Sequence, residues 1–220
     1  MMAEDNMTPS EAGELLKKMK AIASDLWREP PEEPEDRAPK QAQQPAKPVK
    51  KNGAGIDNLW MIADETVDWT DALAHDRPAD GLTSQKMWDF YHRNAEAVLS
   101  GDLQAYAEVL KRANPLGELP EFADGISIRV PDADRAEARF NVKEDYMKKD
   151  GKKYLSAMGL RIARDLLACL PVGEIGVAAV REGQAVLEVT YRRDQLLHRN
   201  FSFLDPVALA AECEAQFNIE

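Results

Sequence analysis

Apolar residues near the start of the chain recur at spacings of three and four, which is the period of an α-helix. Thr8 and Glu11 open this stretch as a capping box, in which the two side chains pair with backbone amides at the helix start. A proline pair beginning at Pro30 ends it, because proline cannot continue a helix. The pattern predicts an amphipathic helix over residues 8–27. The stripe that we expect to contact a partner consists of Leu15, Leu16, Met19, Ile22, Leu26 and Trp27.

Residues 29–55 separate this helix from the rest of the chain and contain almost no large apolar side chain. Such a stretch buries too little apolar surface to offset the entropy of ordering, so we expect a disordered linker rich in Pro, Glu, Lys and Gln. As a flexible coil it spans roughly 30 Å. Because an isolated helix of this length is marginal in water, three arrangements are open. The helix folds back onto its own domain, docks to another protein or to a second copy, or frays in solution.

The remaining residues, 56–220, have the usual size of one domain. Its first third has helical periodicity. Ser84 and Asp102 stand where N-caps are expected, each directly before an apolar helical pattern. The helices that we expect in this part cover residues 56–74, 84–99 and 103–113.

Beyond Gly125 the pattern changes to the alternation of β-strands. Two pairs of alternating runs are joined by short turns, which predicts two β-hairpins. A polar stretch over residues 143–153 is expected to form a loop before a long helix, and Asp205 with Pro206 begins a last helix. The fold class is therefore α+β, with a helical N-terminal half followed by two β-hairpins that form an antiparallel sheet packed with helices. The later elements are expected at residues 126–130, 136–142, 154–170, 175–180, 185–191 and 205–217.

The formal net charge of the chain is −11, which argues against a dedicated binder of nucleic acid or of an anionic membrane. The first residues lack the basic and apolar regions of a signal peptide, and no apolar run approaches the ~18–20 residues of a membrane span. We therefore expect a cytoplasmic protein without a membrane partner. Cys169 and Cys213 lie inside apolar helical patterns, which predicts small core residues.

The common signatures of catalysis and of cofactor binding are missing from the sequence. His75, His92 and His198 are far apart and form no metal-binding pair, and neither a glycine-rich phosphate loop nor a Gly-x-Ser-x-Gly elbow occurs. We expect no catalytic residue, no metal ligand and no cofactor. A catalytic triad assembled in space from distant residues stays open, because its members need not be neighbours in the sequence.

One basic cluster interrupts the acidic background of the chain. Its residues precede the expected long helix. Two further basic residues, Arg161 and Arg164, lie within that helix. The simplest interpretation is a solvated helix face, on which Arg161 pairs with Asp165 at the four-residue spacing. The alternative is an anion-binding site that leaves nucleic acid open as a partner. The cluster consists of Lys148, Lys149, Lys152 and Lys153.

Four stretches of the sequence carry a resemblance to a known domain: GDLQAY at 101–106, NPLG at 114–117, LRIARDLLACLPV at 160–172 and FLDP at 203–206. Over about residues 84–217 the chain resembles an uncharacterised domain of bacterial proteins, some of whose members sit in proteins labelled restriction-endonuclease-type. The resemblance implies a bacterial origin and a recurring domain, and it transfers no catalytic residue. A nuclease of that type needs an acidic-x-Lys motif, and the nearest match here places Arg139 where the lysine should stand.

Two functions from different classes follow from these observations. The first is a non-catalytic protein-interaction or assembly module, in which the tethered helix docks to a protein partner or mediates self-association. The alternative is an accessory component of a bacterial defence or nucleic-acid-processing system.

Overall fold

The computed structural model describes residues 55–78 and 83–219, all of which belong to one compact unit, Ala46–Glu220. The expected N-terminal helix, its apolar stripe and all but the last residue of the expected linker lie outside the described residues.

A five-stranded sheet in the order β1-β2-β3-β4-β5 forms the centre of this unit. The β1/β2 and β3/β4 pairs are antiparallel neighbours, which confirms both predicted hairpins. However, β2 and β3 are parallel, so the prediction of a purely antiparallel sheet is wrong and the sheet is mixed. The reason is that a helix connects the two hairpins. It returns the chain to the end of the sheet where β2 began, so β3 runs in the same direction as β2. The strands are β1 Ala123–Arg129, β2 Arg135–Val142, β3 Glu174–Arg181, β4 Gln184–Arg192 and β5 Gln216–Phe217.

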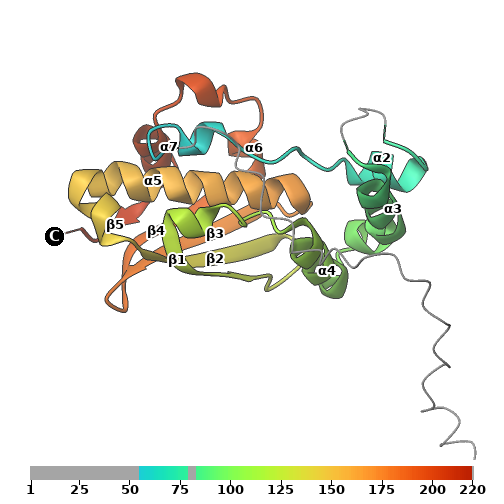
Figure 1. Ribbon diagram of the computed structural model, residues 1–220, viewed down its shortest axis with the longest axis horizontal. Helices are drawn as coiled ribbons and strands as arrows, with labels where there is room; N and C mark the ends of the chain where they lie inside the picture. Colours follow the sequence, from blue (N-terminus) through green and yellow to red (C-terminus); the bar gives the residue numbers. More distant parts are fainter. Residues whose placement is uncertain (1–54, 79–82, 220) are drawn as a thin grey trace, which may run out of the picture. The chain divides into compact units, whose positions relative to one another are not determined.

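This connecting helix, α5 (Glu144–Cys169), lies across one face of the sheet (Figure 1). The prediction of a loop over residues 143–153 is wrong, because these residues form the first turns of α5. Asp150 interrupts the helix with φ −158° and ψ 82°, and its carboxylate accepts a hydrogen bond from the backbone amide of Lys153 at 3.1 Å. Asp150 thus caps the second part of α5, whose start agrees with the helix expected from residue 154.

Among the described residues, three α-helices precede the sheet: α2 (Trp69–Ala74), α3 (Gln85–Leu99) and α4 (Leu103–Ala113). The last two confirm the prediction, and the predicted caps form. Ser84 accepts a hydrogen bond from the amide of Met87, and Asp102 accepts hydrogen bonds from the amides of Gln104 and Ala105. Two short helices follow the sheet's fourth strand, α6 (Arg193–Leu196) and α7 (Pro206–Glu212). The last predicted helix therefore ends earlier than expected, because the chain turns into β5 beside β4.

The helix expected over residues 56–74 is wrong for most of its length. Only a 3-10 turn, Leu59–Met61, and α2 are helical, and the chain between them is extended. This extended segment lies beside the end of α5, where the Val67 amide donates to the Ala168 carbonyl at 2.8 Å and the Trp69 indole donates to the Cys169 carbonyl at 3.1 Å. The last carbonyls of a helix lack partners within the helix. These two bonds favour the extended path, because they supply the missing donors.

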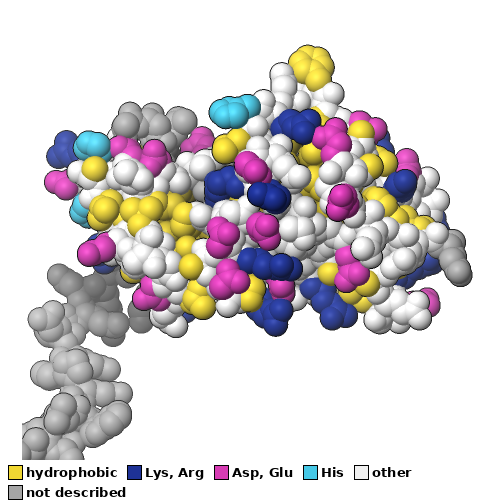
Figure 2. All heavy atoms as spheres, turned by 180° about the vertical axis from the view of Figure 1, so that it is seen from behind, with side chains coloured by type: hydrophobic (Ala, Val, Ile, Leu, Met, Phe, Trp, Pro, Cys, Tyr) yellow, Lys and Arg dark blue, Asp and Glu magenta, His cyan; other side chains and the backbone are white. Residues whose placement is uncertain are grey.

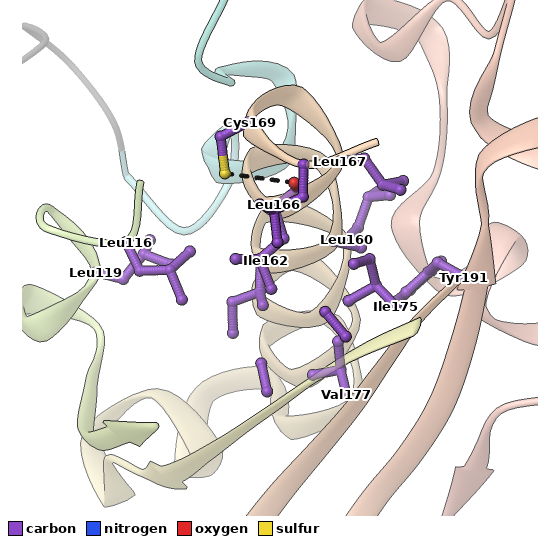
Figure 3. Packing of buried hydrophobic residues seen from close by; sticks show 14 of the residues in the cluster. Leu116, Leu119, Leu160, Ile162, Leu166, Leu167, Cys169, Ile175, Val177 and Tyr191 are labelled. Atoms are coloured by element: carbon purple, nitrogen blue, oxygen red, sulfur yellow. Dashed lines mark hydrogen bonds between the residues drawn. The ribbon is translucent and has the colours of Figure 1, made fainter. Parts of the chain in front are cut away.

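The hydrophobic core lies between α5 and the face of the sheet that α5 covers (Figure 3). Leu160, Ile162 and Leu166 of α5 are fully buried and share this layer with Ile175 of β3 and Tyr191 of β4. Cys169 is buried at the end of α5, as predicted, whereas Cys213 is only half-buried; both thiols are free. Within the described ranges, no helix combines the length and the apolar character that crossing a membrane requires.

Candidate functional site

The two faces of the sheet differ in character. Ala136, Ala138 and Phe140 of β2 are buried on the side of α5, and Arg139, next to them in the chain, is exposed. Because successive side chains of a strand point to opposite faces, Arg139 belongs to the face away from α5. We call this surface, formed by β1 to β4, the outer face. Around Gly176 and Ala178 of β3, its side chains are exposed or partly exposed, and they are mostly charged or small.

A hollow of about 690 Å³ lies in the outer face. Its floor is made by Gly176 and Ala178 of β3, which carry the smallest side chains on this face. The pairing register places Glu137 and Arg139 beside them on β2, and Glu188 beside Ala178 on β4. The outer face is therefore concave, because small residues on the middle strand lie between long side chains on its two neighbours.

Gly176 keeps the floor of this hollow open. A Cβ atom added there would meet Arg135 Nη2 and Glu137 Cγ at 3.5 Å, which is ordinary van der Waals contact. A larger side chain at this position would therefore fill the hollow without displacing backbone.

The charges on the outer face are mixed and locally positive. Arg129 Nη2 lies 2.6 Å from Glu137 Oε2, and Arg135 Nε lies 3.2 Å from Glu137 Oε1. The hydrogen bond from Arg129 is the main cause that holds the pKa of the Glu137 carboxyl below its ordinary value. Arg139 and Glu188 form no ion pair with any described residue. Three arginines and two glutamates thus line the hollow of a chain whose net charge is −11.

Figure 2 views the molecule from the side opposite to that of Figure 1. Positive and negative side chains are intermingled across the middle of this view, with apolar side chains between them. Exposed ion pairs contribute little to folding stability. The charged side chains of the outer face can therefore determine which partner that face accepts.

The lysines expected to bind an anion lie in the first half of α5 and do not line the hollow of the outer face. Two of them have partners of their own. Lys153 Nζ is 2.6 Å from Asp57 Oδ1 and 5.9 Å from the centre of the Trp60 ring, and Lys152 Nζ is 5.0 Å from the centre of the Phe217 ring. Lys148 and Lys149 are exposed. The structure thus divides the cluster, and anion binding there stays a prediction.

The interpretation of Arg161 and Asp165 as a pair on a solvated helix face is wrong. Arg161 is 1% exposed and Asp165 is 0% exposed, and Arg161 Nε donates to Asp165 Oδ2 at 2.5 Å. Asp165 Oδ1 also accepts a hydrogen bond from the Asp64 amide at 3.0 Å, and Glu118 Oε2 lies 3.7 Å from Arg161 Nη2. Burial raises the pKa of Asp165 to about 6, against the opposite effect of Arg161. The i,i+4 spacing did not reveal this burial, since exposed and buried helix pairs share the same spacing.

Arg164, the other arginine of this helix, ties a second segment to α5. It donates a hydrogen bond to the Trp60 carbonyl, and its guanidinium carbon lies 3.7 Å from the centre of the Phe201 ring. Both arginines therefore bind segments that lie beside α5. Arg161 contacts Glu118, and Arg164 contacts Trp60 and Phe201.

The described residues contain no group of three His, Cys, Asp or Glu side chains placed to hold a metal ion. No protein-family model, no curated protein and no solved structure matches this chain. The outer face is therefore the candidate site that the described structure supports best, on its geometry alone.

Proposed function

We propose that this protein is a non-catalytic interaction module whose outer face binds an acidic, amphipathic helix of a partner protein. The observation that carries the proposal is the open hollow above Gly176 and Ala178, bordered by long charged side chains on β2 and β4.

The spacing of the strands supports a helix as the occupant. The side chains that border the hollow stand on strands two positions apart, which is a separation of roughly 10 Å. An α-helix with its side chains is about 10–12 Å wide, so the borders are about one helix diameter apart and a helix lying on top of them would place one row of side chains over the floor. Amphipathic helices bind in such grooves through one apolar face.

The charges support an acidic partner. Arg129 and Arg135 share the single carboxylate of Glu137, and Arg139 forms no ion pair with another described residue. Acidic residues flanking the apolar stripe of a bound helix would therefore find unpaired positive charge. Electrostatic complementarity of this kind mainly increases specificity and the rate of association.

The helix expected over residues 8–27 belongs to the same proposal as a second contact, made with a protein partner or with a second copy of the chain. Two linked contacts increase the overall affinity, because the second one forms within an existing complex. We place this assembly in the cytoplasm, following the expectation from the sequence.

A defined peptide tests the outer face. The probe is a fluorescein-labelled helical peptide with a leucine stripe flanked by glutamates, and the matched control carries lysines in place of the glutamates. We expect the acidic peptide to bind about tenfold more tightly in fluorescence anisotropy, with an affinity that falls as salt is added. Equal binding of the two peptides would refute the proposal.

Substitutions locate the binding on the surface. Gly176→Leu fills the hollow, and Arg139→Glu reverses the unpaired charge; each should weaken binding of the acidic peptide about tenfold, which corresponds to about 1.4 kcal/mol. Lys86→Glu makes the same charge change at an exposed position of α3 and should leave the affinity unchanged. If the acidic peptide does not bind and a DNA duplex binds at low salt, the alternative function in nucleic-acid processing is favoured instead.

A further inference from the structure

A second hollow, of about 710 Å³, lies between the extended segment before α2, helix α3 and the end of α5. We call it the acidic groove. It shares no lining residue with the hollow of the outer face. Its mouth carries four carboxylates, Asp64, Glu65, Asp68 and Asp71, and none of its lining residues is a lysine or an arginine.

Two of these carboxylates are oriented by local hydrogen bonds. Asp68 caps α2 by accepting from the amides of Thr70 at 3.0 Å and of Asp71 at 2.9 Å. Asp71 Oδ1 lies 2.6 Å from His75 Nδ1. Glu65 is exposed and has no ion pair or hydrogen bond with a residue of the described segments. Neither Glu65 nor Asp68 forms an ion pair with a described residue, and a carboxylate that caps a helix keeps its charge, so the mouth of the groove is a negative surface.

The floor of the groove is apolar and aromatic. It is formed in part by Met87, Trp88 and Tyr91, which lie on one side of α3. The indole of Trp88 is satisfied, because it donates to the His75 carbonyl at 2.9 Å. An apolar floor below a negative mouth suits a ligand with an apolar stem and a positive end.

Tyr91 provides an independent indication of a ligand. Its side chain is only 9% exposed, and its hydroxyl forms no hydrogen bond with any residue in the described part of the chain. Burial raises the pKa of this hydroxyl to about 12, and Cys169 and Asp64, two lining residues of the groove, act in the same direction, while Arg112 of α4 opposes them. The Tyr91 hydroxyl is not one of the buried polar atoms that lack a partner, so its oxygen is open to the groove that Tyr91 lines and can accept a hydrogen bond from a ligand.

We propose that the acidic groove binds the side chain of a lysine in an extended basic segment of a partner protein. The methylene groups of the lysine pack on Met87 and Trp88, the Tyr91 hydroxyl accepts one ammonium proton, and the carboxylates of the mouth balance the charge. The proposal rests on residues other than those of the outer face, so its failure would leave the proposed function intact.

The test uses the full chain and a fluorescein-labelled peptide of alternating glycine, serine and lysine residues. The same peptide with acetylated lysines keeps the stems and loses the positive charge. We expect the lysine peptide to bind at least tenfold more tightly in fluorescence anisotropy. Equal affinity for the acetylated peptide would overturn the proposal. Displacement of the lysine peptide by free cadaverine at an equal concentration of amino groups would also overturn it, since the ligand would then be a small amine.

Two variants separate the specific site from the general negative charge of the protein. Tyr91→Phe removes only the hydroxyl, and it should weaken binding about fivefold while the thermal midpoint stays the same or rises, because the hydroxyl has no partner to lose. Glu65→Gln should weaken binding about threefold, whereas Glu96→Gln, the same change at an exposed position of α3, should have no effect. Binding by the Tyr91→Phe variant that equals that of the original chain would contradict the site, even if Glu65→Gln weakens it.

Discussion

Replacement of Arg161 by methionine tests its buried ion pair with Asp165. Methionine fills much of the volume of the arginine stem, but it leaves the fully buried carboxylate of Asp165 with only the Asp64 amide as a partner. Removing one partner of a buried ion pair costs about 3–5 kcal/mol, because the remaining charge is left without compensation. Arg161 Nη1 is itself buried without a hydrogen bond, and the loss of this unsatisfied group offsets part of the cost. We therefore expect a loss of about 3 kcal/mol near pH 8.

The loss should depend on pH in a defined direction. Burial raises the folded-state pKa of Asp165 to about 6, above its ordinary value of 3.8. A raised pKa means that the folded state holds the proton more tightly than the unfolded state, so the stabilisation by protonation is complete below about pH 4 and is lost as the pH rises through 6. Without Arg161, the pKa of Asp165 rises further, so the carboxyl becomes neutral at a higher pH. The difference in stability between the variant and the original chain should thus be smaller at pH 5 than at pH 8.

Urea unfolding followed by tryptophan fluorescence measures this effect at pH 5 and pH 8, since Trp60, Trp69 and Trp88 are buried. Adding Asp165→Asn to the Arg161→Met variant should restore most of the stability at pH 8, because a neutral amide still accepts from the Asp64 amide. Arg199→Met is the control: it breaks an ion pair with Glu212 whose side chains are 42% and 54% exposed, and it should cost less than about 1 kcal/mol. A loss that is equal at both pH values, with no recovery in the double variant, would refute the reasoning.

Two further predictions concern local structure and thiol chemistry. Asp102→Ala should destabilise the domain by about 1 kcal/mol in the same assay, because two amides at the start of α4 lose their acceptor, while Asp102→Asn should cost only a small part of that. Ellman's reagent should react with Cys213 well before Cys169, because burial raises the pKa of the Cys169 thiol to about 12 and the thiolate is the reacting form. Rapid modification of Cys169 in the folded protein would count against the packing at the end of α5.

The outer face shows how much of a candidate site the sequence reveals. The alternation along β2 and β3 identifies which residues share a face, and the positions of Gly176 and Ala178 are visible in that pattern. Their meaning depends on the parallel pairing of β2 with β3, which brings Arg139 beside Ala178. This pairing joins residues far apart in the sequence, and no local pattern specifies it.

The sequence by itself determined the elements whose causes are local. Ser84 and Asp102 cap α3 and α4 because a side-chain oxygen two or three residues before an amide is enough to bind it. The turn between β3 and β4 contains Gly183 with φ 84°, a conformation that glycine adopts without a steric cost, so the second hairpin is also recognisable from its residues.

The tertiary structure alone decided the features that depend on distant partners. The segment before α2 is extended because the carbonyls at the end of α5 accept its hydrogen bonds, although its own apolar period is helical. Arg161 and Asp165 are buried because that segment and Glu118 lie over them, although their spacing also suits an exposed helix face. A pattern of residues specifies which side chains share a face of an element, and the packing of remote segments determines whether that face is covered.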